Sequence, residues 1–218
     1  MNFYEEKQNE FFTDKHKKYG YSHKSLCWES PYTQNARFVE LLKMFTFVDL
    51  GETISILDYG CGLAHLYGFL KDNGFLSKFR INYTGVDINE NFVKEANLKY
   101  PGINVRIKDE TIFNEEFDFV FCSGLYNLKF SPEFDIYAHF KSDLKKLYDI
   151  SRYGVGVNFQ SKNAVPLIPK KFVDEEMKRF YFHDEKVVLG HLKEISKDLK
   201  VSNGYLPHDF TIYLMKMI

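Results

Sequence analysis

The sequence predicts an α/β fold with a mostly parallel sheet, preceded by a helical N-terminal segment. Short apolar runs alternate with amphipathic stretches from about residue 54 to residue 160. This alternation is typical of parallel strands that are joined by right-handed helical crossovers, with helices on both faces of the sheet. The last two apolar runs are too close together for a crossover helix, so they should pair antiparallel.

The expected elements follow one another along the chain. Residues 2–19 are polar with interleaved aromatic residues, consistent with a helix or a flexible arm. The next helix begins at Ser30-Pro31, because proline is favoured in the first helical turn, and it extends to about residue 50. Strands are expected over residues 54–59, 83–88, 105–107, 117–122, 154–159, 199–201 and 210–215, and further helices over residues 63–72, 90–100, 134–151 and 184–196. We therefore divide the chain into a helical cap, residues 1–50, and an α/β domain, residues 51–218.

One long segment has no predicted element. It spans residues 160–171 and contains Pro166 and Pro169. Because it follows the fifth strand, this loop could close over a substrate.

The charge balance argues against nucleic acid as a partner. The chain has 29 Lys and Arg residues against 30 Asp and Glu residues, and its basic clusters are short. Nucleic-acid binding normally needs a stronger positive field, because the neutralisation of phosphates supplies most of the affinity. We therefore expect no nucleic-acid partner.

Cysteine usage and hydropathy bear on the compartment. Cys27, Cys61 and Cys122 are widely spaced, which predicts neither a zinc site nor a disulfide framework. The first residues show no signal pattern, and no apolar run approaches membrane-spanning length. We expect a cytoplasmic protein that does not bind membranes.

The most informative motif is Asp58-Tyr59-Gly60-Cys61-Gly62, which ends an apolar run and precedes a helical pattern. Glycines at such a turn let the backbone approach a ligand closely. The dinucleotide fingerprint Gly-x-Gly-x-x-Gly would need a third glycine at position 65, where the chain has His65. A structural turn without a ligand is the other alternative.

An Asp-x-Gly-x-Gly motif after a strand, followed by an antiparallel C-terminal pair, resembles the class I S-adenosylmethionine-dependent methyltransferases. The resemblance implies a Rossmann-like, three-layer α/β/α fold with a seven-stranded sheet whose last strand is antiparallel. It also implies S-adenosylmethionine as the methyl donor and S-adenosylhomocysteine as the product. Gly60, Cys61 and Gly62 would admit the amino-acid part of the cofactor, and Asp58 would engage its ammonium group.

The turns after the second and third strands carry further cofactor candidates that the resemblance implies. Asp87 is the expected ribose ligand, since a carboxylate can accept two hydrogen bonds from a diol; its alternative role is to cap the next helix. Ile88 beside it would pack on the adenine face. Asp109 and Glu110 would reach the adenine amino group, and a plain polar turn is the alternative there.

The turn after the fourth strand should border both the methyl donor and the acceptor. Ser123 and Gly124 would expose backbone to the cofactor. Tyr126 and Asn127 would point toward the acceptor and are the candidate catalytic residues, unless they merely shape the loop. The turn lacks the Asn-Pro-Pro-Tyr and Asp-Pro-Pro-Tyr patterns of enzymes that methylate nucleic-acid amino groups, which favours a small-molecule acceptor.

The segment before the glycine motif is the expected cap. Trp28 is the single tryptophan and lies in a predicted loop. Gln34 and Arg37 are one helical turn apart and share a face. In the family that this chain resembles, an N-terminal arm or helix folds over the cofactor. Either residue could therefore meet the carboxylate of the cofactor, or both could lie on a solvent-exposed face.

These observations predict a methyltransferase that acts on an oxygen or nitrogen atom of a small molecule. The sulfonium donor is already activated, so the protein has to align the reactants and exclude water. For an acceptor that needs a base, the candidates are Tyr126, Asn158, Gln160, His208 and Asp209. No metal-binding constellation is visible. The chain also looks similar to uncharacterised bacterial methyltransferases.

Two other classes of function remain open. The first is a non-catalytic binding or scaffold protein that keeps the fold. The second is a nicotinamide-dependent oxidoreductase, which His65 and the antiparallel tail disfavour. The oligomeric state is not predicted.

Overall fold

A single mixed sheet organises the molecule. The computed structural model describes residues 3–131, 133–163 and 179–216 of the chain. The strands lie in the order β3-β2-β1-β4-β5-β7-β6. Neighbours among β1 to β5 pair parallel, whereas β7 runs antiparallel to both β5 and β6. The strands are β1 (Thr53–Tyr59), β2 (Arg80–Asp87), β3 (Asn104–Ile107), β4 (Phe117–Cys122), β5 (Ser151–Gln160), β6 (Asp198–Asn203) and β7 (Asp209–Met215). The predicted fold class is confirmed.

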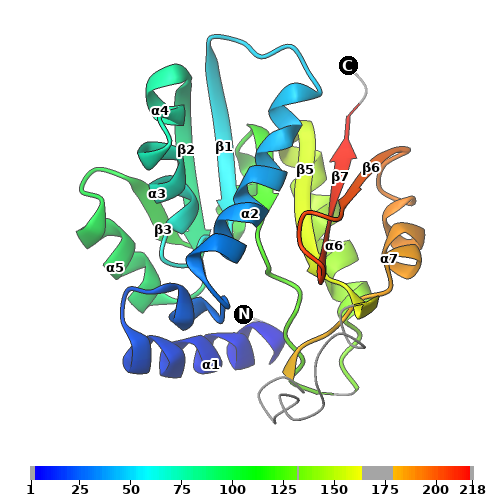
Figure 1. The fold of residues 1–218 in the computed structure, drawn as a ribbon, viewed down its shortest axis with the longest axis horizontal. Helices are drawn as coiled ribbons and strands as arrows, with labels where there is room; N and C mark the ends of the chain where they lie inside the picture. Colours follow the sequence, from blue (N-terminus) through cyan, green and yellow to red (C-terminus); the bar gives the residue numbers. More distant parts are fainter. Residues whose placement is uncertain (1–2, 132, 164–178, 217–218) are drawn as a thin grey trace.

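Helices cover both faces of this sheet (Figure 1). The helices are α1 (Phe3–Tyr19), η1 (His23–Leu26), α2 (Pro31–Leu42), η2 (Lys43–Thr46), α3 (His65–Asp72), α4 (Phe75–Lys78), α5 (Glu90–Lys99), η3 (Glu110–Asn114), α6 (Ile136–Ile150) and α7 (Glu185–Leu192). The helix expected up to residue 50 is shorter, because the chain tightens into the 3₁₀ turn η2 after Leu42. Most of the loop expected at residues 160–171, with Pro166 and Pro169, lies outside the described residues.

Two apolar clusters hold the layers together, one on each face of the sheet. Helix α6 shows the pattern that builds them: its buried side chains recur every three or four residues, which places them on one side of the helix. These are Ile136, Phe140, Leu144, Leu147 and Ile150, and they pack with α7 and η3 against one face. Residues of α2, α3 and α5 pack against the other face.

Helix α2 lies close to the sheet because β5 presents bare backbone to it. A Cβ atom at Gly156 would lie 2.9 Å from the Met44 sulfur and 3.1 Å from a Leu41 methyl carbon. The start of the helix is fixed by a capping box, in which the Ser30 hydroxyl accepts a hydrogen bond from Thr33 N at 3.2 Å. The capping box thus sets where α2 begins, and Gly156 lets the helix lie close to β5.

Helix α1 lies across those carboxyl ends, where β1 and its neighbours terminate (Figure 1). The Tyr4 hydroxyl donates to Leu128 O at 3.0 Å, and Gln8 Nε2 donates to Leu125 O at 3.2 Å. The N-terminal segment is therefore a docked helix rather than a flexible arm. In the described part of the chain, no helix has the length and apolar character needed to span a membrane.

Candidate functional site

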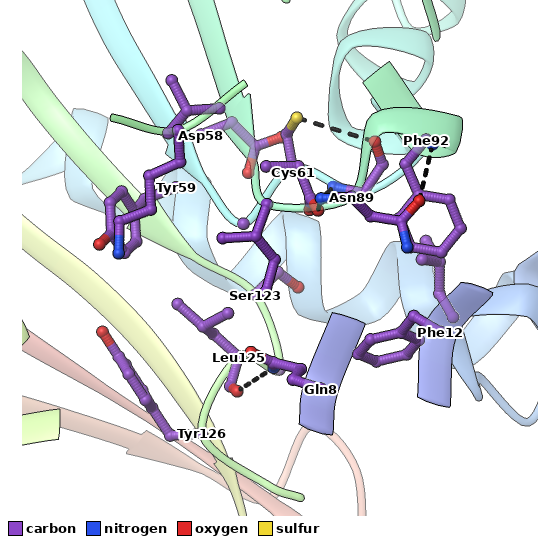
Figure 2. Close-up of a pocket in the computed structure, with 18 of the residues that line it drawn as sticks. Gln8, Phe12, Asp58, Tyr59, Cys61, Asn89, Phe92, Ser123, Leu125 and Tyr126 are labelled. Carbon is purple, nitrogen blue, oxygen red and sulfur yellow. Dashed lines mark hydrogen bonds between the residues drawn. The ribbon is translucent and has the colours of Figure 1, made fainter. Parts of the chain in front are cut away.

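A cavity lies between the carboxyl ends of the parallel strands and helix α1 (Figure 2). Strand ends and turns form one wall, and α1, η1, α2 and the loop before α2 form the other. The wall formed by strand ends and turns includes Asp58, Tyr59, Gly60, Cys61, Gly62, Val86, Asp87, Ile88, Asn89, Lys108, Ser123, Gly124, Leu125 and Tyr126. The covering wall includes Tyr4, Glu5, Gln8, Asn9, Phe12, Leu26, Trp28, Gln34 and Phe38.

The glycine turn after β1 brings backbone to the cavity surface. Gly60 has φ +76° and Gly62 has φ +54°, both in the left-handed region that glycine adopts without strain. Gly60 N and Cys61 N both donate to Val86 O, at 2.8 and 3.0 Å. A Cβ at Gly60 would lie 2.7 Å from Leu125, so a side chain there would push on the turn after β4.

Asp58 lies under this turn and is almost fully buried. Its Oδ2 accepts a hydrogen bond from the Tyr83 hydroxyl at 2.7 Å. Burial raises the pKa of Asp58 to about 7, because the charged carboxylate loses hydration, although the bond from Tyr83 works in the opposite direction. A cationic ligand would therefore stabilise the charged form of the Asp58 carboxylate.

Asp87 ends β2 and connects two sides of the cavity. Its Oδ2 accepts from Gly62 N and its Oδ1 from Asn89 N, each at 2.8 Å. Burial raises the pKa of Asp87 to about 6, and these backbone bonds partly oppose the shift. The helix cap that was the alternative role for Asp87 is supplied by Asn89, whose Oδ1 accepts from Asn91 N and Phe92 N.

Three hydrogen bonds hold the turn after β4 in place. Asn158 Oδ1 accepts from Gly124 N at 2.9 Å, and Asn127 Oδ1 accepts from Gln160 N at 3.0 Å. His183 Nε2 lies 3.1 Å from Tyr126 O. Burial lowers the pKa of His183 to about 4, so the neutral ring donates this bond. The turn is a fixed wall of the cavity.

Trp28 covers the same turn. A Cβ at Gly124 would lie 2.4 Å from the indole, so the bare backbone at this position is required by the contact. The Arg37 guanidinium carbon lies 4.6 Å from the centre of the Trp28 ring. Arg37 also forms a buried ion pair with Asp209 at the start of β7 and donates to Thr33 O.

Gln34 reaches the cavity from α2, where its Nε2 lies 3.0 Å from His65 Nδ1. Burial, with a smaller effect of His23, lowers the pKa of His65 to about 4. The neutral imidazole can therefore accept the bond from the Gln34 amide. This pair fixes the start of α3 beside the glycine turn.

The structure brings most of the predicted site residues together. Asp58, Gly60, Cys61, Gly62, Asp87, Ile88, Ser123, Gly124 and Tyr126 all line the cavity. Four other predicted residues are not among those lining it: Asp109, Glu110, Arg37 and Asn127. Asp109 is exposed and accepts a hydrogen bond from Thr111 N at 2.8 Å, as the cap of η3, and Glu110 is also exposed. Arg37 and Asn127 are occupied by the partners described above.

Sequence reasoning missed the contributions of α1 and α6 to the cavity. Glu5 of α1 forms an ion pair with Lys108, directly beside the predicted Asp109. From α6, His139 and Asp143 line the cavity four residues apart, on one helix face. This spacing was visible in the sequence, but the place of the two side chains at the cavity depends on how α6 docks on the sheet. In the described ranges, no group of three or more His, Cys, Asp or Glu residues could hold a metal ion.

Comparisons with known proteins agree with this architecture. The family model described as "Methyltransferase domain" matches residues 57–135, from the glycine turn to the start of α6. A curated relative, "Putative methyltransferase Rv1506c" of Mycobacterium tuberculosis, is 27% identical over 172 residues, which cover 78% of this chain and 97% of that protein.

Solved structures share the fold at low sequence identity. The magnesium protoporphyrin IX methyltransferase of Synechocystis PCC 6803, crystallised with S-adenosylhomocysteine, has a TM-score of 0.65 and 15% identity, and the match covers 98% of each chain. The plantazolicin methyltransferase BamL, in complex with a triazolic desmethyl analogue and S-adenosylhomocysteine, has a TM-score of 0.65 and 13% identity, with coverage of 96% and 97%.

Proposed function

Because the chain belongs to the class I S-adenosylmethionine-dependent methyltransferase superfamily, we propose that it transfers a methyl group to an oxygen or nitrogen atom of a small-molecule acceptor. S-adenosylmethionine is the methyl donor and S-adenosylhomocysteine the product. Residues 1–50 would act as the cap of the α/β domain that follows.

The observation that carries this proposal is the juxtaposition of the glycine turn with two buried carboxylates in one cavity. In the part of the chain that the structure describes, Asp58 accepts a hydrogen bond from the Tyr83 hydroxyl and Asp87 accepts from backbone N–H groups, and neither accepts one from a cationic side chain. Burial raises the pKa of both carboxyl groups. A ligand with an ammonium group and a ribose diol would compensate both carboxylates. We assign the ammonium group of the donor to Asp58 and its ribose diol to Asp87. The bare backbone of Gly60 and Gly62 would lie against the part of the donor between these two groups.

The residues of the cavity would support methyl transfer by position and by exclusion of water. When bound, the donor supplies a sulfonium-activated methyl group. Ser123 and Gly124 border the space where that group would lie, and Trp28 and Gln8 close it from the side of the cap. Catalysis would then rest on alignment of the acceptor. Gln34 remains the candidate for the donor's carboxylate, since it lines the cavity while Arg37 pairs with Asp209.

The two predicted catalytic residues have different surroundings. Tyr126 lines the cavity, and burial holds the pKa of its hydroxyl well above the ordinary value, so it would act as a hydrogen-bond donor rather than as a base. Asn127 holds Gln160 N and would position the turn. Nucleic-acid acceptors are not part of the proposal, since the chain carries a formal net charge of −1.

Calorimetric titration with S-adenosylhomocysteine and with NAD tests the proposal. We expect saturable binding of S-adenosylhomocysteine and none of NAD at the same concentrations. Incubation with methyl-labelled S-adenosylmethionine and a panel of small amines, phenols and carboxylic acids should then transfer label to one class of acceptor. Binding without any transfer would favour the non-catalytic scaffold, and binding of NAD alone would reject the proposal.

Cofactor binding should weaken as the solution becomes more acidic. Because the pKa of Asp58 is raised to about 7, lowering the pH from 8 to 6.5 protonates this carboxylate and removes the charge that would face the ammonium group. A single group with this pKa predicts a loss of roughly fourfold in affinity for S-adenosylhomocysteine over that range. Titrations across the range measure the slope, and Asp58→Asn should flatten it. A wild-type slope equal to that of Asp58→Asn would contradict the assignment.

A further inference from the structure

Two asparagines join the turn after β4 to β5 beyond the point where the two strands stop pairing. The last residue of β4 in this ladder is Cys122. Past it, Asn158 Oδ1 accepts a hydrogen bond from Gly124 N at 2.9 Å, and Asn127 Oδ1 accepts one from Gln160 N at 3.0 Å. Side-chain amides therefore replace the ladder where the turn borders the cavity.

The bond to Asn158 fixes a peptide group that the backbone alone leaves free to turn. Gly124 has φ +70°, and a glycine can leave this region for other φ values without a steric penalty. Asn158 is 1% exposed, and its oxygen is the atom of the amide that can accept a bond from an N–H group. The direction of the peptide between Ser123 and Gly124 therefore depends on the side chain of Asn158.

The positions of the neighbouring strands show where this peptide points. The peptide bond between Ser123 and Gly124 is trans, so its C=O and its N–H point in opposite directions. Strand β4 lies between β1 and β5 in the sheet. Because the N–H group points to Asn158 on β5, the Ser123 carbonyl points toward β1 and the glycine turn that follows it.

The Ser123 carbonyl thus faces the part of the cavity assigned to the middle of the donor. The turns after β1 and β4 are adjacent, since a Cβ at Gly60 would lie 2.7 Å from the Leu125 side chain, and both Ser123 and Gly60 line the cavity. In S-adenosylmethionine the sulfonium lies between the ammonium group and the ribose, which is the part placed against Gly60 and Gly62. A carbonyl oxygen carries a partial negative charge, so it favours a cation at this position.

We propose that Asn158 is a positioning residue that makes the site prefer the methyl donor over its product: through Gly124 N, it holds the Ser123 carbonyl toward the sulfonium. This inference rests on the proposed function. S-adenosylhomocysteine has lost the methyl group and, with it, the positive charge on sulfur. The Ser123 carbonyl therefore stabilises the bound donor more than the bound product, and the spent cofactor is exchanged for fresh donor more readily.

Calorimetric titration with both compounds measures this preference without an acceptor. The quantity compared is the dissociation constant of S-adenosylhomocysteine divided by that of S-adenosylmethionine, which isolates the methyl group and its charge because the rest of the two molecules is the same. Asn158→Ala frees the peptide and should lower this ratio at least about threefold relative to the wild type, the scale of one weak contact to a carbonyl oxygen. Asn158→Asp keeps an oxygen that accepts from Gly124 N, and its ratio should equal or exceed that of the wild type.

Thr211→Val is the matched control, and it should keep the wild-type ratio. Thr211 is as buried as Asn158 and pairs with it across β5 and β7, but its hydroxyl lies 2.9 Å from the Tyr205 hydroxyl and not on the turn. Trp28, the single tryptophan, packs over Gly124, so its fluorescence reports the turn. The emission should change in Asn158→Ala and stay the same in Thr211→Val.

Thermal unfolding of each variant establishes that it is folded before titration. If Asn158→Ala does not fold, Asn158→Val gives the same test, because its branched side chain suits a strand. An unchanged ratio in the folded variant, or an equal fall in Thr211→Val, would overturn the role of Asn158 alone. A folded wild type that binds neither compound would overturn the proposed function and this inference with it.

Discussion

Replacement of Asp87 by alanine is expected to weaken binding of S-adenosylhomocysteine at least tenfold, or about 1.4 kcal/mol. Two effects combine in this loss. The variant would lack the carboxylate assigned to the ribose diol, and it would also release Gly62 N and Asn89 N, which Asp87 now holds at 2.8 Å each. Isothermal titration calorimetry at pH 8 measures the dissociation constant.

Glu90→Ala is the control for this change, because Glu90 is an exposed acid three positions further along the chain. Its affinity should match that of the wild type. Asp87→Asn separates the two effects, since the amide oxygen can still accept one backbone bond while the charge is lost. Wild-type affinity in Asp87→Ala would mean that the ribose lies elsewhere.

Replacement of Arg37 by methionine is expected to lower the free energy of unfolding by about 3–5 kcal/mol, the usual result of removing one partner of a buried ion pair. Arg37 and Asp209 are both about 4% exposed, so the remaining carboxylate would stay buried and without its cation. Trp28 would also lose the guanidinium that lies over its ring. Urea unfolding followed by circular dichroism measures the change.

The double variant Arg37→Met, Asp209→Leu identifies the cause. Because it removes both charges, it should recover most of the lost stability. If the double variant is as unstable as Arg37→Met alone, the loss comes from packing against Trp28 and not from the unpaired charge. A stable Arg37→Met with weak cofactor binding would instead support the alternative in which Arg37 meets the donor's carboxylate.

The order and type of the strands could be predicted because local patterns specify them. Ile54, Ile56 and Leu57 form a mostly apolar run that is buried in the sheet, and the glycines at 60 and 62 mark the turn that follows. The short spacing between β6 and β7 left an antiparallel pair as the simple solution, and the structure shows that pair. Asp58 and Asp87 could be placed together because both lie at the carboxyl ends of such strands.

The remaining site residues depend on contacts between segments that are far apart in the chain. Glu5 meets Lys108 across 103 positions, and Gln8 meets Leu125 across 117. No periodicity within α1 indicates that it lies over the strand ends. Arg37 shares a turn with Gln34, yet their side chains diverge because Asp209 of β7 offers Arg37 a charged partner.

The sequence by itself predicted the fold class and the resemblance to a methyltransferase superfamily, and it placed the glycine turn and the two acids beside it, because these depend on short-range patterning. The tertiary structure alone decided which charged side chains face the cavity. Asp109 and Asp143 are both acids on polar segments, but the first caps η3 in solvent and the second is carried to the wall of the cavity by the docking of α6. The burial and the direction of a side chain depend on how the helices and strands pack together, and a sequence pattern does not specify that packing.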